Sequence, residues 1–115
     1  MFVQFLRFAG PRSAELVEAS RRAGHDRIEP LILADPDLRG RLLGGFRAVA
    51  SDGTETVVVV ATDTAAFDEI AHIALSSDLL PGEDPALLLQ PDRVEQCGTV
   101  EFFGPMADVL ARAGR

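Results

Sequence analysis

Five polar residues fall inside segments that otherwise resemble buried strands. Gln4 and Arg7 interrupt the apolar run Phe2–Phe8, Arg47 lies in a second predicted strand, and Glu95 and Glu101 lie in the last one. An arginine keeps its charge when it is buried, so it needs an anion from the chain, from a partner or from a ligand. We therefore expect Arg7, Arg47, Glu101 and Gln4 to form a polar cluster, with Arg7 beside Glu101, that binds a carboxylate, phenolate or enolate. The alternative is a network of ion pairs at an interface or at exposed strand ends.

The other reactive side chains are weaker candidates, and no catalytic residue is assigned. His72 is the obvious general base, but its helical position places it beside Asp68 on the solvated face. His25 follows a glycine in a predicted loop, and the two histidines lack the spacing of zinc ligands. Cys97 is the single cysteine and lies within a predicted strand, so we expect a buried, inert thiol. No metal and no cofactor is predicted.

Composition excludes several classes of protein. The 115 residues carry a net charge of −7, and the eleven basic residues are all arginines scattered along the chain. Nucleic acid and anionic membrane are therefore not expected partners, because either requires a basic surface. Without lysine there is no Schiff-base or phosphate-loop lysine, and no apolar run reaches the 18 residues of a membrane span. We expect one cytoplasmic domain.

The apolar runs and their breakers predict the order βαββαβ, which is the ferredoxin-like pattern. This is an α+β fold with a four-stranded antiparallel sheet and helices on one face. The predicted domain covers residues 1–104, and residues 105–115 form a short helix or a tail that docks on a partner. The predicted elements are a strand over 2–8, helical pieces over 12–23 and 26–34, a turn at 35–37, strands over 41–50 and 55–62, a helix to Ser76, a solvated connector over 78–91 and a strand over 93–103.

The clearest local signal is Asp52-Gly53 between two apolar runs, which favours a two-residue type I′ hairpin with Ser51 opposite Thr54. That register divides the sheet into two faces. The face under the helices would carry Phe46, Ala48, Val57, Val59 and Ala61, and the other face would carry Arg47, Val49, Thr56, Val58, Val60 and Thr62. Two helices cover only one face, so we expect a second copy of the chain to cover the other.

With this layout the chain resembles the dimeric α+β-barrel proteins of the antibiotic-biosynthesis monooxygenase type. The resemblance covers Phe2 to about Phe103. It rests on the Met1-Phe2-Val3-Gln4 opening, the Ser51–Thr54 hairpin and the Val57–Ala61 strand that leads into the Phe67-Asp68-Glu69 helix. It implies a homodimer in which two sheets face each other and close a barrel. The Asn, Trp and Tyr that haem-degrading and oxygenase members use are absent here, so no family catalytic residue is carried over.

Two functions follow as expectations. The first is a dimer that binds a hydrophobic or aromatic metabolite, acting as a cofactor-free, monooxygenase-like enzyme in which Arg7 or Arg47 stabilises a substrate anion. The second is a non-catalytic ligand sensor or a structural dimer module.

Overall fold

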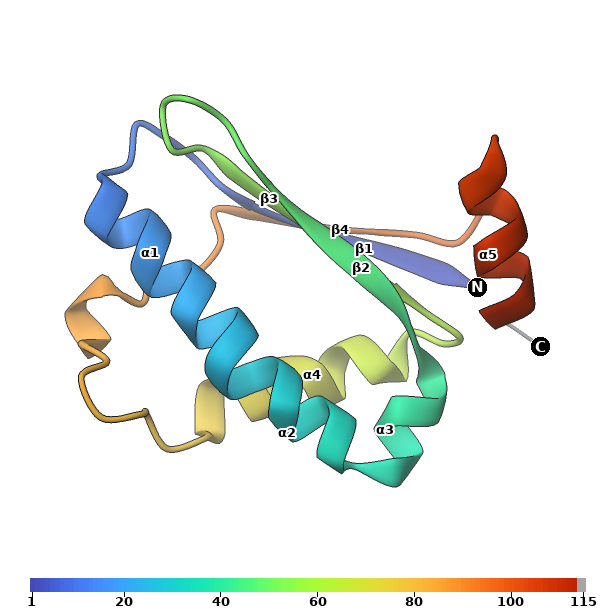
Figure 1. Cartoon of the computed structure of the whole chain (residues 1–115), viewed down its shortest axis with the longest axis horizontal. Coiled ribbons are helices and arrows are strands. Elements are labelled where there is room, and N and C mark those ends of the chain that lie inside the picture. Colours follow the sequence, from blue (N-terminus) through green and yellow to red (C-terminus); the bar gives the residue numbers. More distant parts are fainter. Residues whose placement is uncertain (114–115) are drawn as a thin grey trace.

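The structure is a computed structural model that describes residues 1–113. Its elements follow one another as a strand, a long helical region, a hairpin, a helix, a short strand and a terminal helix (Figure 1). They are β1 (Phe2–Phe8), α1 (Ala14–Arg22), a π-helical turn (Ala23–Ile28), α2 (Glu29–Ala34), α3 (Pro36–Arg41), β2 (Leu42–Val49), β3 (Glu55–Ala61), α4 (Ala65–Ser76), a 3₁₀ turn (Pro85–Leu87), β4 (Arg93–Cys97) and α5 (Pro105–Ala113).

The four strands form one antiparallel sheet in the order β2-β3-β1-β4. The predicted α+β class and four-stranded antiparallel sheet are confirmed, and this strand order is compatible with a ferredoxin-like fold. The helices α1 to α4 lie together on one side of the sheet, whereas α5 stands at the end of the sheet where β1 begins (Figure 1). The long helical region begins at Ser13, whose hydroxyl accepts a hydrogen bond from the Leu16 amide at 3.2 Å.

Two local predictions are wrong in their boundaries. The segment predicted as a turn at residues 35–37 begins helix α3. Asp35 caps that helix by accepting hydrogen bonds from the amides of Asp37 and Leu38, and Pro36 occupies its first position. The predicted helical pieces are one continuous helix from Ala14 to Ala34, because a π-helical turn replaces the expected break at Gly24. Glycine weakens a helix but does not end it when the following residues still pack.

The hairpin is one residue longer than predicted. The Ala50 amide donates to the Thr54 carbonyl at 2.8 Å, and the Gly53 amide donates to the Ala50 carbonyl at 2.9 Å. Within this loop only Gly53 has a positive φ, of 90°, so the loop is a three-residue turn with a glycine bulge. The Asp52 carboxylate accepts hydrogen bonds from the Thr54 amide and hydroxyl, and this local bonding stabilises the longer turn.

The extra residue shifts the register by one and reverses the predicted faces of β2. Phe46 lies opposite Val58, and Arg47 lies opposite Val57. Phe46 and Ala48 are therefore on the face away from the helices, whereas Arg47 and Val49 point to the helix side. The faces predicted for β3 are correct. Val59 and Ala61 pack with Ile32, Leu38, Ala66 and Phe67 in the core between sheet and helices.

The last strand is shorter than predicted. β4 ends at Cys97, and residues 98–103 leave the sheet instead of continuing it. Val100 and Phe102 pack instead on Val3, Val58 and Val60, a second apolar cluster on the far side of the sheet. Within residues 1–113, no helix is long and apolar enough to cross a membrane.

Candidate functional site

The candidate site is the face of the sheet that α1 to α4 leave uncovered, which we call the open face. Residues directly opposite one another in neighbouring strands share a face, so the register identifies its members. They are Val3, Phe5 and Arg7 from β1, Phe46 and Ala48 from β2, Thr56, Val58 and Val60 from β3, and Arg93, Glu95 and Cys97 from β4. The face is apolar where β1 begins and charged where β1 ends.

The apolar half of the open face holds a groove of about 450 Å³. Its floor is Val3, Val58 and Val60, and the segment after β4 forms its wall with Val100 and Phe102. Helix α5 closes one side by placing Met106 and Leu110 against the groove. A volume in this range suits a small organic molecule, and an apolar lining is usual for such sites.

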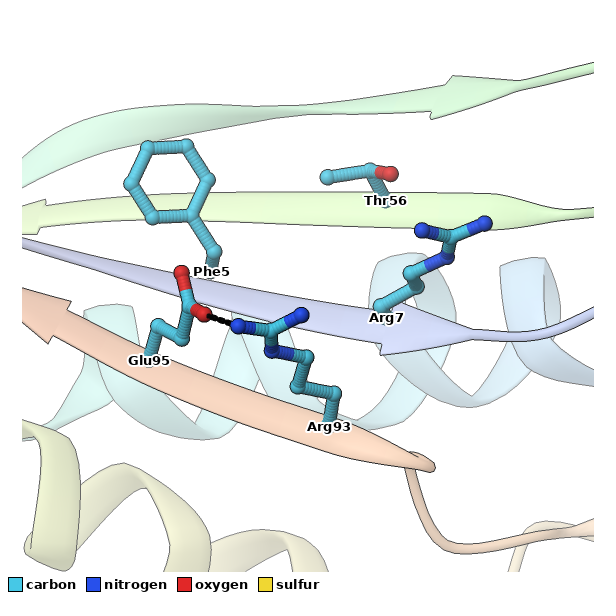
Figure 2. A pocket seen from close by; sticks show the side chains of 5 residues that line it. All are labelled: Phe5, Arg7, Thr56, Arg93 and Glu95. Carbon is cyan, nitrogen blue, oxygen red and sulfur yellow. Dashed lines mark ion pairs between the residues drawn. The ribbon is translucent and has the colours of Figure 1, made fainter.

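The charged half forms a shallow hollow of about 270 Å³. Figure 2 shows Arg7, Arg93 and Glu95 standing over the sheet with Phe5 and Thr56. Arg93 forms an ion pair with Glu95, its neighbour two positions along β4. Arg7 lies directly opposite Arg93 in the strand pairing and has no ion pair within residues 1–113. Two like charges directly opposite each other destabilise a sheet unless an anion approaches them.

The predicted polar cluster is not assembled within one chain. Arg7 is exposed at the charged end of the open face, and Glu101 lies beyond the end of β4, at the opposite end of the sheet. The expectation that Arg7 neighbours Glu101 in the chain is therefore wrong, because β4 ends four residues before Glu101. Gln4 points to the helix side, opposite Gln96, and Arg47 points the same way.

Arg47 belongs instead to a buried charge cluster that the sequence did not reveal. Its guanidinium lies 2.7 Å from the Glu55 carboxylate, and Arg12 lies 3.7 Å from the same carboxylate. The Ser20 hydroxyl donates to Glu55 at 3.3 Å. These residues come from β2, β3, α1 and the segment before α1, so only the fold brings them together. The cluster stabilises the hairpin end of the molecule and has no access to the groove.

A second buried pair fixes the segment after α4. Arg27 donates to the Glu83 carboxylate at 2.8 Å, and both side chains are almost fully buried. Glu83 also accepts a hydrogen bond from the Leu80 amide at 2.7 Å. The predicted solvated connector is thus wrong at Glu83, because the carboxylate is the buried anchor of this loop. Its function is structural.

The histidines and the cysteine carry no catalytic arrangement. His72 is exposed on α4, and His25 is exposed and lies 2.8 Å from Asp26, whose pKa this contact lowers. Cys97 is half-buried and lines the groove. Among residues 1–113, no three His, Cys, Asp or Glu side chains come together in a way that could hold a metal ion.

Comparison with known proteins adds no identification. No family model, no curated protein and no solved structure matches the chain. The resemblance to dimeric α+β-barrel proteins therefore stays a prediction.

Proposed function

We propose that the protein is a homodimer in which two open faces close on each other, and that the enclosed apolar groove binds a hydrophobic small molecule. The observation that carries the proposal is the groove of about 450 Å³ between Val3, Val58 and Val60 and the segment that includes Phe102. An apolar hollow that remains open to water is unfavourable in an isolated chain. A partner that covers it and a ligand that fills it both remove that cost.

The solvent-accessible surface of the chain is larger than expected for a monomer of its mass, which supports the homodimer. A folded monomer of 12.3 kDa exposes about 6,100 Å² by the usual scaling of surface with mass. This chain exposes 7245 Å², which is an excess of about 1,100 Å². A subunit of a stable dimer covers about 800 Å² or more. The radius of gyration of 14.5 Å also exceeds the roughly 13.3 Å expected for a compact domain of this length.

Several exposed large apolar side chains lie on and beside the open face. Phe46 is 58% exposed and Met106 is 55% exposed. Phe5, at the centre of the face, is also exposed and lines both the groove and the charged hollow. Covering these side chains with the same surface of a second copy requires no other partner, because an isologous contact uses one patch twice.

The groove supports binding better than catalysis. Of the residues that line it, Cys97 and Glu101 are the titratable ones, and they come from different segments. A cofactor-free oxygenase needs a base beside the substrate, and neither histidine lies on the open face. Of the two predicted functions, we therefore favour the non-catalytic ligand-binding dimer over the monooxygenase-like enzyme.

The test compares two variants of helix α5. Met106 lines the groove, whereas Val109 is equally exposed, at 57%, and does not line it. We expect the wild type to sediment as a dimer at micromolar concentration and to enhance the fluorescence of 1-anilinonaphthalene-8-sulfonate. Met106→Glu should abolish the enhancement by placing a charge against the groove. Val109→Glu is the control and should retain both dimer and fluorescence.

Native mass spectrometry of freshly purified protein provides the second readout. A retained organic molecule in the wild type and in Val109→Glu, but not in Met106→Glu, would support the groove as the ligand site. A wild-type monomer, or equal dye binding by both variants, would refute the proposal. Oxygen consumption on addition of an aromatic substrate would favour the monooxygenase-like enzyme instead.

A further inference from the structure

The two ends of the open face carry opposite charges that have no partner within residues 1–113. At the end where β1 finishes, the Arg93–Glu95 pair is neutral and Arg7 remains as a single positive charge. At the other end Glu101 lines the groove, is exposed, and forms no ion pair within the same residues. Phe5 lies between the two ends and borders both hollows.

Symmetry restricts how two such faces can meet. When two copies of a sheet face each other, the two-fold axis that relates them lies in the plane between the sheets. An axis along the strands places each end of one face over the same end of the other. An axis across the strands places each end over the opposite end. Both arrangements cover the same face of each copy, and they differ in which charged side chains meet.

The axis along the strands brings like charges together. Arg7 and Arg93 of both copies would then meet in one region with two glutamates at position 95, and the two Glu101 side chains would meet at the far end. The axis across the strands gives each Arg7 an acidic partner and each Glu101 a basic one. A contact between like charges in a partly desolvated interface strongly disfavours the first arrangement.

We infer that the two-fold axis runs across the strands, so that Arg7 of each subunit pairs with Glu101 of the partner subunit. The inference rests on the homodimer proposed above and assigns its alignment. Arg7 thereby obtains a direct ion pair, which residues 1–113 of its own chain do not provide. The two Phe5 rings lie near the axis and contact each other, because Phe5 is central and belongs to both halves of the face.

The same axis also gives helix α5 a position against the partner subunit. The helix stands on the open side of the sheet at the Glu101 end (Figure 1). In the inferred dimer it comes beside the hairpin end of the partner's sheet, where Ala48 remains exposed in the single chain. Each groove is then closed by the charged half of the other subunit, and neither site is complete in one chain.

Charge reversal tests the alignment directly. Arg7→Glu and Glu101→Arg should each weaken the homodimer on the order of 100-fold in Kd, because each replaces two attractive contacts with two repulsive ones. The double variant Arg7→Glu/Glu101→Arg should restore the dimer. Both residues are exposed, so circular dichroism should show that the fold of every variant is retained.

Mixing the two single variants is the sharpest measurement. In a heterodimer of Arg7→Glu with Glu101→Arg, both contacts between positions 7 and 101 are again attractive. In one of them the signs of the two charges are exchanged. Native mass spectrometry of an equimolar mixture should therefore show the heterodimer in large excess over either homodimer. Arg39→Glu and Glu29→Arg are the controls, because they change net charge equally at exposed positions on the helices and should mix statistically.

The outcomes separate this inference from the proposed function. If the wild type is a monomer, both the homodimer and its alignment are wrong. If the wild type is a dimer and the Arg7 and Glu101 variants behave like the controls, only the alignment is wrong. If Arg7→Glu loses a retained ligand and mixing with Glu101→Arg does not restore the dimer, the anion beside Arg7 comes from a ligand and the inferred pair is refuted.

Discussion

Glu55 offers the sharpest prediction about stability, because its carboxylate is the only anion in a buried cluster of two arginines. The side chain is 2% exposed, lies 2.7 Å from Arg47 and 3.7 Å from Arg12, and accepts a hydrogen bond from Ser20. Glu55→Gln keeps the shape of the side chain and removes its charge. The change therefore isolates the electrostatic contribution of the cluster from its packing.

The expected loss in the free energy of unfolding depends on whether water can reach the arginines that lose their counter-charge. The Arg47 side chain is 30% exposed and can be solvated, whereas the Arg12 side chain is 5% exposed and cannot. Leaving one buried charge uncompensated costs about 3–5 kcal/mol. We expect about 3 kcal/mol, at the lower end, because only Arg12 is left both buried and without a counter-charge. Such a loss is a large fraction of the roughly 5–15 kcal/mol that stabilises a domain.

Arg12→Met should cost less than Glu55→Gln, since Glu55 then keeps Arg47 at 2.7 Å. Arg12 also lies over the Phe8 ring, 5.2 Å from its centroid, so the substitution loses some packing. The double variant should cost less than the sum of the two single variants, because neither charge is then left alone. This non-additivity distinguishes a charge pair from two independent losses.

The assay is urea unfolding at pH 7 and one fixed protein concentration, followed by far-UV circular dichroism. The fixed concentration matters because dimerisation would contribute to the apparent free energy of unfolding. Glu15→Gln, the same chemical change at an exposed position on α1, should stay within about 0.5 kcal/mol of wild type. Glu55→Gln as stable as this control, or single costs that add in the double variant, would refute the reasoning.

Three further predictions concern the turn, the acid limb and the loop after α4. Gly53→Val should lower the free energy of unfolding by about 2–3 kcal/mol in thermal unfolding, because φ is 90° and a Cβ would lie 2.4 Å from a carbonyl oxygen. Gly24→Ala is the control and should cause no loss of stability, because a Cβ there meets nothing within 4 Å. Arg41 lowers the pKa of the Asp63 carboxyl by hydrogen bonding, so the stability this provides is complete above about pH 4 and is lost as the pH falls further. Asp63→Asn should therefore flatten the decline of the urea midpoint below pH 4, and an unchanged decline would contradict this assignment. Arg27→Met should remove the ion pair with Glu83 that holds the loop after α4, and limited proteolysis would detect this as faster cleavage in the loop. An unchanged cleavage rate would show that other contacts hold the loop.

Local sequence patterns predicted the elements because each depends on neighbours in the chain. The β-branched run Val57–Val60 formed a strand with alternate faces, as expected, and Asp52-Gly53 formed a turn with positive φ at the glycine. The same patterns could not distinguish a two-residue turn from a three-residue turn. One residue of difference moved Arg47 to the helix side and Phe46 to the open face.

The pairing of distant charges was decided by the tertiary structure. In the sequence, Arg7 and Glu101 are both polar residues within apolar runs, and that pattern predicts burial without identifying the partner. Because β4 ends at Cys97, Arg7 and Glu101 lie at opposite ends of one face. Glu55, for which no local pattern predicted burial, is the buried anion that two arginines share. Alternation along a strand depends on the stereochemistry of the chain itself, whereas the neighbour across the sheet depends on register and strand length, which only the packing of the whole domain determines.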